Sequence, residues 1–182
     1  MNLPNAITIA RLLSVPFIGW LILRERYSWA LVAFGVAAAS DAVDGLLARL
    51  LDQRTPLGAT LDPAADKLLV VTGLAALWWV GHIPGWLFGI VLGRDLTLSA
   101  AYWGMFAAGR RLPVQPSLFG KATTVLQLLL VLWIIWDASR SAPPGPPHVP
   151  LWLLVAVAGI TLASGLLYVR SGYRMLQEGK AA

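Results

Sequence analysis

Long apolar segments, separated by short polar ones, are the feature of this sequence that most restricts its fold. Of the 182 residues, 58% are hydrophobic and only 13% are charged. A water-soluble domain with an ordinary polar surface carries a larger share of charged residues. The apolar runs are too long, and alternate too little, to be strands. The sequence therefore predicts an all-α integral membrane protein, whose helices satisfy their own backbone hydrogen bonds in lipid.

Six transmembrane helices are expected, and they should form a single domain over residues 1–182. The predicted spans cover residues 1–24, 28–51, 61–80, 85–109, 117–137 and 151–169. Pro16 should kink the first span and set off a partly interfacial N-terminal segment. Residues 52–60, which include Pro56 and Gly58, are expected to form a polar loop, and residues 139–150 a Pro-rich loop.

The basic residues predict how the chain crosses the membrane. If residue 1 is cytoplasmic, three basic residues lie outside and seven lie in the cytoplasm, namely Arg49, Arg54, Arg110, Arg111, Arg170, Arg174 and Lys180. The positive-inside rule favours this orientation, in a multi-pass protein of the cell (inner or plasma) membrane. The net charge of +5 suits anionic lipids and nucleotides as partners, and no segment suggests nucleic-acid binding.

Four aspartates lie where the second predicted span ends and the third begins. Asp41 and Asp44 are three residues apart, and Asp62 and Asp66 are four apart, so each pair shares a helix face. Ionisable residues are costly in a membrane and mark functional sites. Four oxygen donors in a chain without cysteine suit Mg²⁺ or Mn²⁺. For Asp62 alone there is a second interpretation, since Asp62-Pro63 also fits a helix N-cap followed by proline.

The aspartates belong to a longer pattern, D-x2-D-G-x2-A-R-x8-G-x3-D-x3-D, whose fixed positions are Asp41, Asp44, Gly45, Ala48, Arg49, Gly58, Asp62 and Asp66. This pattern resembles the signature of the class I CDP-alcohol phosphotransferases. The resemblance implies that Asp41, Asp44 and Asp62 are ligands of a two-metal site. It implies that Asp66 is both a metal ligand and the general base that deprotonates the acceptor alcohol as CMP is displaced. Gly45, Ala48, Arg49 and Gly58 would then bind nucleotide and phosphate.

Physical chemistry supports these last assignments. Gly45 and Gly58 have no side chain, so nucleotide and backbone can approach closely. The planar guanidinium of Arg49 can hold a phosphate through two hydrogen bonds, which a lysine does less well. Because the second span ends at the membrane face where the third begins, the site is expected on the cytoplasmic side.

Two further segments resemble the same family. The pattern P-N-x-x-T-x-x-R is matched from Pro4, and it adds Asn5 and Thr8 to the nucleotide site and Arg11 to the phosphates of acceptor or lipid. An N-cap and an interfacial arginine are the competing interpretation. The run from Arg110 to Gln127 includes G-K-x-x-T-x-x-Q. It adds five residues to the acceptor side: Arg110, Arg111, Ser117, Lys121 and Thr124. The alternative for this segment is that Lys121 extends to the membrane surface while Thr124 and Gln127 form a weak helix-packing face.

Arg94 and Asp95 lie in the middle of the fourth predicted span. Adjacent helical residues point in different directions, so a mutual ion pair is not expected. At least one of them should face the carboxylate site or a partner subunit, and Arg94 is assigned to acceptor phosphate. His82 is expected to be solvated or structural, and His148 is given no role.

The resemblance implies an enzyme of phospholipid biosynthesis that transfers a phosphatidyl group from CDP-diacylglycerol to an alcohol, and such enzymes are commonly homodimers. Phosphatidylglycerol, giving cardiolipin, is the favoured acceptor, because no second arginine follows Arg94 on the fourth span. The alternative is a phosphatidylglycerophosphate synthase, which uses the more highly charged glycerol-3-phosphate. A remote alternative is an ion-coupled transporter, whose charged site belongs near the membrane midplane.

Overall fold

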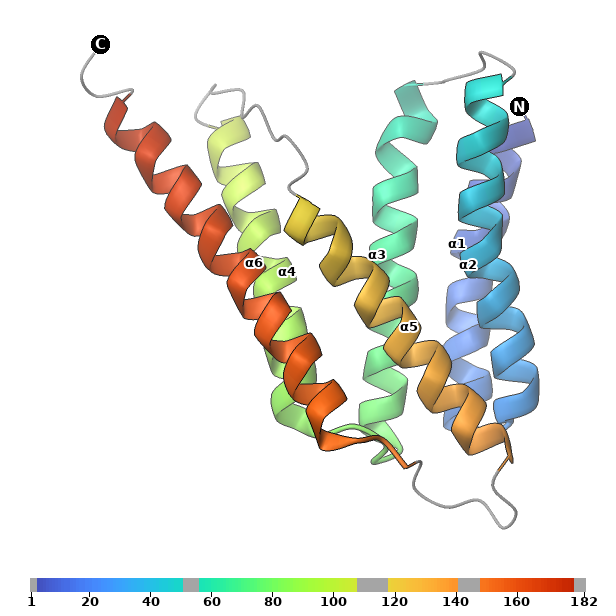
Figure 1. The fold of residues 1–182 in the computed structure, drawn as a ribbon. Helices are drawn as coiled ribbons and strands as arrows, with labels where there is room; N and C mark the ends of the chain where they lie inside the picture. Colours follow the sequence, from blue (N-terminus) through green and yellow to red (C-terminus); the bar gives the residue numbers. More distant parts are fainter. Residues whose placement is uncertain (1–2, 51–55, 108–117, 141–147, 179–182) are drawn as a thin grey trace. The chain divides into compact units, whose positions relative to one another are not determined.

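The computed structural model describes the backbone of residues 3–50, 56–107, 118–140 and 148–178 (Figure 1). Side chains are described for residues 8–40, 65–101, 104, 120–140 and 148–170. Within the described backbone, all regular structure is helical. The six helices are α1 (Leu3–Leu23), α2 (Tyr27–Leu50), α3 (Pro56–Trp79), α4 (Gly85–Ala107), α5 (Leu118–Arg140) and α6 (Leu151–Glu178). Each predicted span overlaps one helix, so the all-α prediction is confirmed for this part of the chain.

Two boundaries differ from the prediction. The third helix begins at Pro56 and not near residue 61, so Gly58 lies in the first turn of α3 and not in a loop. Asp62 is likewise inside α3, which contradicts its interpretation as an N-cap. Proline is tolerated in a first helical turn because its missing N–H has no helical partner there. From the sequence alone, either Pro56 or Pro63 could mark such a first turn, and the structure shows that it is Pro56. The sixth helix also continues beyond residue 169, to Glu178.

Among the residues whose side chains are described, two helical stretches, Gly120–Arg140 and Leu151–Arg170, are long and apolar enough to cross a membrane. Shorter apolar helical stretches cover Thr8–Leu23 and Tyr27–Ser40. Large apolar side chains are also exposed on the described helices, among them Trp29, Trp79 and Trp152, which are 69%, 76% and 70% exposed. Tryptophan side chains with such large exposed fractions suit contact with lipid better than contact with water.

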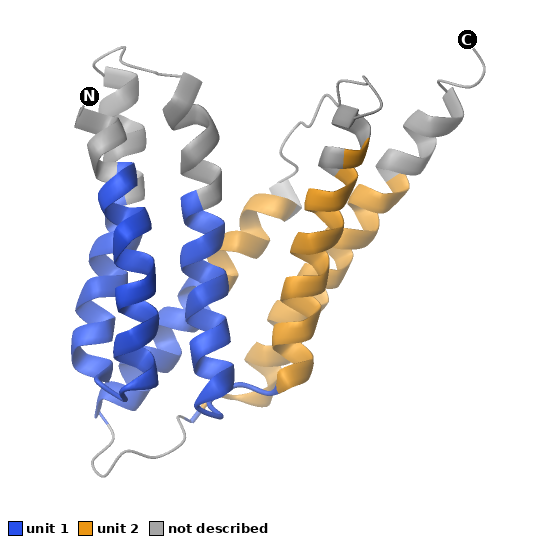
Figure 2. Cartoon of the chain, turned by 180° about the vertical axis from the view of Figure 1, so that it is seen from behind, with its two compact units in different colours: residues 1–84, 128–148 blue, residues 85–127, 149–182 orange. Residues whose placement is uncertain are grey.

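The chain forms two compact units, residues 1–84 with 128–148 and residues 85–127 with 149–182 (Figure 2). In the first unit α1 packs against both α2 and α3. Its core is apolar and close-packed, and includes the fully buried Ile18, Phe34 and Leu74. In the second unit α4 packs against α6. Each unit is therefore held together by helix–helix contacts of its own.

The helices α1 and α3 end in the same type of turn. The N–H of Arg26 donates to the carbonyl of Leu21 (2.9 Å), and the N–H of His82 donates to that of Leu77 (2.8 Å). Such bonds accompany a left-handed residue just past the helix end. At the end of α3 this residue is Gly81 (φ 83°), which adopts the conformation freely, but at the end of α1 it is Glu25 (φ 56°).

A hydrogen bond joins the turn after α3 to the first residue of α2. The His82 Nε2 and the Tyr27 hydroxyl lie 2.7 Å apart, and their rings are in tilted contact. Burial lowers the pKa of His82 from its ordinary 6.5, against a smaller raising effect of the Glu25 carboxylate. Of the two expectations for His82, solvated or structural, the structure supports the structural one.

Candidate active site on helices α1, α2 and α3

The best-described part of the candidate site is an ion pair between α1 and α3. The Arg11 Nη1 donates to the Asp66 Oδ1 at 2.9 Å. The Arg11 side chain is 1% exposed, whereas that of Asp66 is 35% exposed. Thr8, one turn earlier on α1, is also buried. The structure thus brings Arg11 and Asp66 into contact, two candidate site residues that lie 55 positions apart in the sequence.

The other aspartates of the motif lie on helical backbone, but their side chains are outside the described residues. Asp41 and Asp44, with Gly45, Ala48 and Arg49, are in the last turns of α2, and Asp62 is one turn before Asp66 on α3. The predicted i, i+3 and i, i+4 spacings are therefore helical spacings. Asn5 lies in the first turn of α1, also without a described side chain. Arg110, Arg111 and Ser117 lie outside the described residues altogether.

Arg94 and Asp95 do form an ion pair, which contradicts the sequence expectation. The Arg94 Nη1 lies 2.6 Å from the Asp95 Oδ1, and the Arg94 Nη2 donates to the Ser164 Oγ of α6 at 3.0 Å. The expectation considered only the directions in which adjacent side chains leave a helix. The long side chain of arginine can bend back to its neighbour. The Arg94 aliphatic stem also packs on Gly165, where a Cβ would lie 3.4 Å from the Arg94 Cγ.

The expected polar stripe on α5 divides into an exposed and a buried part. Lys121 is exposed, and the Thr124 hydroxyl donates to the carbonyl of Gly120 at 3.2 Å. Gln127 is buried, and its Nε2 donates to the Thr161 Oγ1 at 3.1 Å. The packing interpretation therefore holds for Gln127, whereas the exposed Lys121 remains accessible to a ligand.

Sequence reasoning missed the buried hydroxyl residues that join these helices. Thr161 is the partner of Gln127 and Ser164 that of Arg94, and both are fully buried, three residues apart on α6. Small hydroxyl residues at helical spacing within an apolar segment are the signal that could have identified them, because such residues hydrogen-bond across packed helices.

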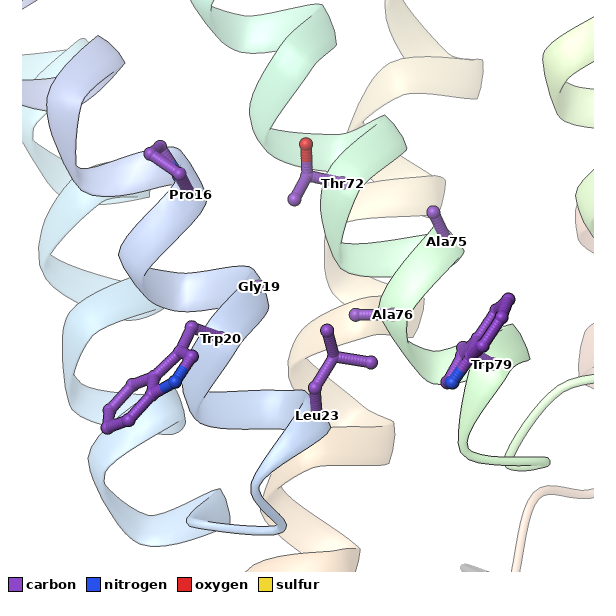
Figure 3. A pocket seen from close by; sticks show the side chains of 8 residues that line it. All are labelled: Pro16, Gly19, Trp20, Leu23, Thr72, Ala75, Ala76 and Trp79. Atoms are coloured by element: carbon purple, nitrogen blue, oxygen red, sulfur yellow. The ribbon is translucent and has the colours of Figure 1, made fainter.

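An apolar groove lies between α1 and α3 in the same unit as the ion pair (Figure 3). Its volume is about 360 Å³, and Thr72 is the polar residue among its lining side chains. Pro16 and Thr72 line one part of it, and Leu23 and Trp79 line another. At 1.5 Å per helical residue, the groove begins about 8–9 Å along the helix axes from Arg11 and Asp66.

The sequence as a whole matches a known family. Residues 1–167 match the model of the CDP-alcohol phosphatidyltransferases. The chain belongs to this family. A CDP-diacylglycerol–glycerol-3-phosphate 3-phosphatidyltransferase from Pseudomonas fluorescens is 36% identical over 191 residues, which cover 100% of this chain and 90% of the relative. An Escherichia coli K12 protein of the same name is 34% identical, over 74% of this chain and 77% of the relative.

Another relative, with a different name, is a CMP-forming cardiolipin synthase from Streptomyces coelicolor. It is 34% identical over 196 residues, which cover 100% of this chain and 87% of the relative. Most of these relatives are named CDP-diacylglycerol–glycerol-3-phosphate 3-phosphatidyltransferase. This CDP-alcohol phosphatidyltransferase is therefore an enzyme of phospholipid biosynthesis, and the resemblance noted in the sequence is confirmed.

Proposed function

We propose that this enzyme transfers the phosphatidyl group of CDP-diacylglycerol to glycerol-3-phosphate, forming phosphatidylglycerophosphate and CMP. The observation that carries this proposal is the similarity over the whole chain to the Pseudomonas fluorescens enzyme of that name. The sequence alone favoured phosphatidylglycerol as acceptor, and the comparisons favour the alternative.

The sequence argument for phosphatidylglycerol depended in part on the absence of a second arginine after Arg94 on the fourth helix. The Arg94 guanidinium is held by Asp95 and Ser164 within its own unit. The positive charge of Arg94 is therefore already paired with a carboxylate, so the number of arginines on α4 is a weak guide to the charge of the acceptor. The exposed Lys121, with Arg110 and Arg111, supplies cationic groups that are independent of α4.

In the proposed reaction Asp66 is the general base. Its carboxylate takes the proton of the acceptor hydroxyl as the hydroxyl oxygen attacks the phosphorus of the phosphatidyl group. A new P–O bond forms, the P–O bond to CMP breaks, and CMP leaves with the bonding electrons. Arg49 binds a phosphate of the nucleotide, while Gly45 and Gly58 leave room for it. Phosphoryl transfer depends mainly on such positioning and on charge neutralisation.

The four aspartates would hold Mg²⁺ or Mn²⁺. The donor set fits, because carboxylate oxygens are the ligands that these ions prefer and Asp66 keeps a third of its side chain exposed. No group of three or more His, Cys, Asp or Glu side chains suited to a metal occurs among residues 8–40, 65–101, 104, 120–140 and 148–170. When bound, such ions neutralise phosphate charge and assist departure of the leaving group.

A membrane setting supports a lipid donor. Each of the six helices has between 21 and 28 residues, and about 20 are enough to cross the hydrocarbon core. We propose that all six cross the membrane, with the site on the cytoplasmic side as the basic residues predict. The groove between α1 and α3 would then accept an acyl chain close to the reacting head group. A homodimer remains a prediction from the family resemblance.

Product analysis tests the acceptor. Purified enzyme is given CDP-diacylglycerol with glycerol-3-phosphate in one reaction and with phosphatidylglycerol in another, and the lipids are separated by thin-layer chromatography. We expect phosphatidylglycerophosphate in the first reaction and no cardiolipin in the second. Cardiolipin from phosphatidylglycerol, with no product from glycerol-3-phosphate, would reverse the assignment in favour of the function of the Streptomyces relative.

A further inference from the structure

The ion pair between Arg11 and Asp66 is asymmetric in its access to the surroundings. The guanidinium side of the pair is enclosed, since the Arg11 side chain is 1% exposed. The carboxylate side is open, since Asp66 is 35% exposed. A substrate can therefore reach Asp66 directly, whereas it cannot reach Arg11 unless α1 or its neighbours move.

The burial of Arg11 also explains why it needs a partner. An arginine is always charged, and a buried charge is tolerated only when it is paired and hydrogen-bonded. The 2.9 Å contact supplies a charge-assisted hydrogen bond to one named oxygen, Oδ1. The Arg11 backbone is itself held in α1, where its carbonyl accepts a hydrogen bond from the Ser14 hydroxyl (2.7 Å). Arg11 is thus a fixed group against which the Asp66 carboxylate is oriented.

We propose that Arg11 is a positioning residue for Asp66 and not a ligand of a substrate phosphate. Arg11 holds Oδ1 and so fixes the rotation of the carboxylate, while the exposed part of Asp66 meets the acceptor hydroxyl. This inference rests on the proposed function insofar as Asp66 acts on that hydroxyl. It replaces the sequence-based assignment of Arg11 to the phosphates of acceptor or lipid.

Kinetics separate the two roles. A lost phosphate ligand raises KM for the substrate that it binds, whereas a displaced general base lowers kcat. We expect Arg11→Gln to lower kcat by about tenfold to a hundredfold, the loss expected for a misplaced catalytic group, with little change in KM for CDP-diacylglycerol or glycerol-3-phosphate. Arg11→Lys should recover part of kcat, because it keeps the charge. Arg24→Gln, the same change at an exposed arginine of the turn after α1, is the matched control and should have normal kinetics.

A raised KM with normal kcat in Arg11→Gln would overturn the proposal, and so would unchanged kinetics. If Arg11→Gln does not fold, Arg11→Lys carries the same comparison. Loss of kcat with an unchanged KM in that variant supports positioning, and a raised KM with normal kcat contradicts it.

A stability cycle tests the pair without reference to activity. The melting temperature is measured in detergent for wild type, Arg11→Gln, Asp66→Asn and the double variant. Asp66→Asn removes the carboxylate charge that the buried Arg11 contacts, so it should lower the melting temperature, and the double variant should lose less than the sum of the two single variants. Strictly additive losses would show that the two residues are not coupled and would sink the inference. Because this cycle needs no substrate, it gives its answer even if the proposed acceptor is wrong.

Discussion

At the scale of single residues, the contact between Arg11 and Asp66 joins two side chains that lie 55 positions apart in the sequence. Arg11 and Asp66 were both singled out by the family resemblance, but nothing in their spacing indicated that they touch. The contact arises because α1 packs on α3 and brings position 11 level with position 66. Asp66 is also the aspartate of the motif whose side chain is described, so it offers the clearest test at this scale.

Replacement of Asp66 by asparagine should abolish turnover while the protein still inserts into membranes. Asparagine cannot accept the proton of the acceptor hydroxyl, and loss of a general base costs about 10²–10⁴ in rate. Loss of a metal ligand would add to this. The measurement is CMP release by purified protein. Asp137→Asn, the same change at the C-terminal end of α5, is the control and should remain active. Near-normal turnover in Asp66→Asn would exclude the general-base assignment.

Glu25 carries backbone strain that sequence could not predict. A left-handed conformation costs a residue with a Cβ about 1–2 kcal/mol, and glycine avoids that cost. We therefore expect Glu25→Gly to stabilise the protein by about 1 kcal/mol. Gly81→Ala places a Cβ in the equivalent turn after α3, and should destabilise by a similar amount. Thermal unfolding in detergent measures both, and shifts of the same sign in the two variants would contradict this account of the turns.

At the scale of helices, hydrophobicity predicted where the six elements lie, because an apolar run of this length has few other ways to satisfy its backbone. The boundaries were less determined. Pro56 and Pro63 both suit a first helical turn, and only the structure shows that α3 begins at the earlier one. Tertiary contacts were not predictable in this way, because the bent Arg94 side chain and the buried hydroxyls of α6 depend on which helices pack together.

The contact between α1 and α3 depends on a glycine. A Cβ at Gly19 would lie 2.9 Å from the Thr72 Cγ2, which is closer than packed carbon atoms approach. Gly35 on α2 has no atom within 4 Å of the same position. We expect Gly19→Ala to destabilise by about 1–3 kcal/mol through overpacking. Gly35→Ala should be neutral or stabilising by up to about 1 kcal/mol, because alanine favours a helix. The melting temperatures of the two variants test both predictions, and equal stabilisation by the two substitutions would refute close packing at Gly19.

At the scale of the whole molecule, the family match and the helical architecture agree with each other; the aspartate motif had predicted the family, and the long apolar runs had predicted the helices. The acceptor alcohol was the part that sequence predicted least well, because it depends on which cations face the substrate. The account as a whole requires that the protein be an enzyme and not a carrier of ions. Charged residues in apolar helices are consistent with either class, so chemistry must separate them.

Release of CMP by the purified protein is the most direct test. The protein in detergent–lipid micelles is given CDP-diacylglycerol, glycerol-3-phosphate and Mg²⁺ or Mn²⁺, and CMP is quantified over time. We expect release that requires both substrates, stops after exhaustive chelation of divalent metal and is unaffected by thiol reagents, since the chain has no cysteine. Mg²⁺ flux through proteoliposomes without any CMP release would contradict the account.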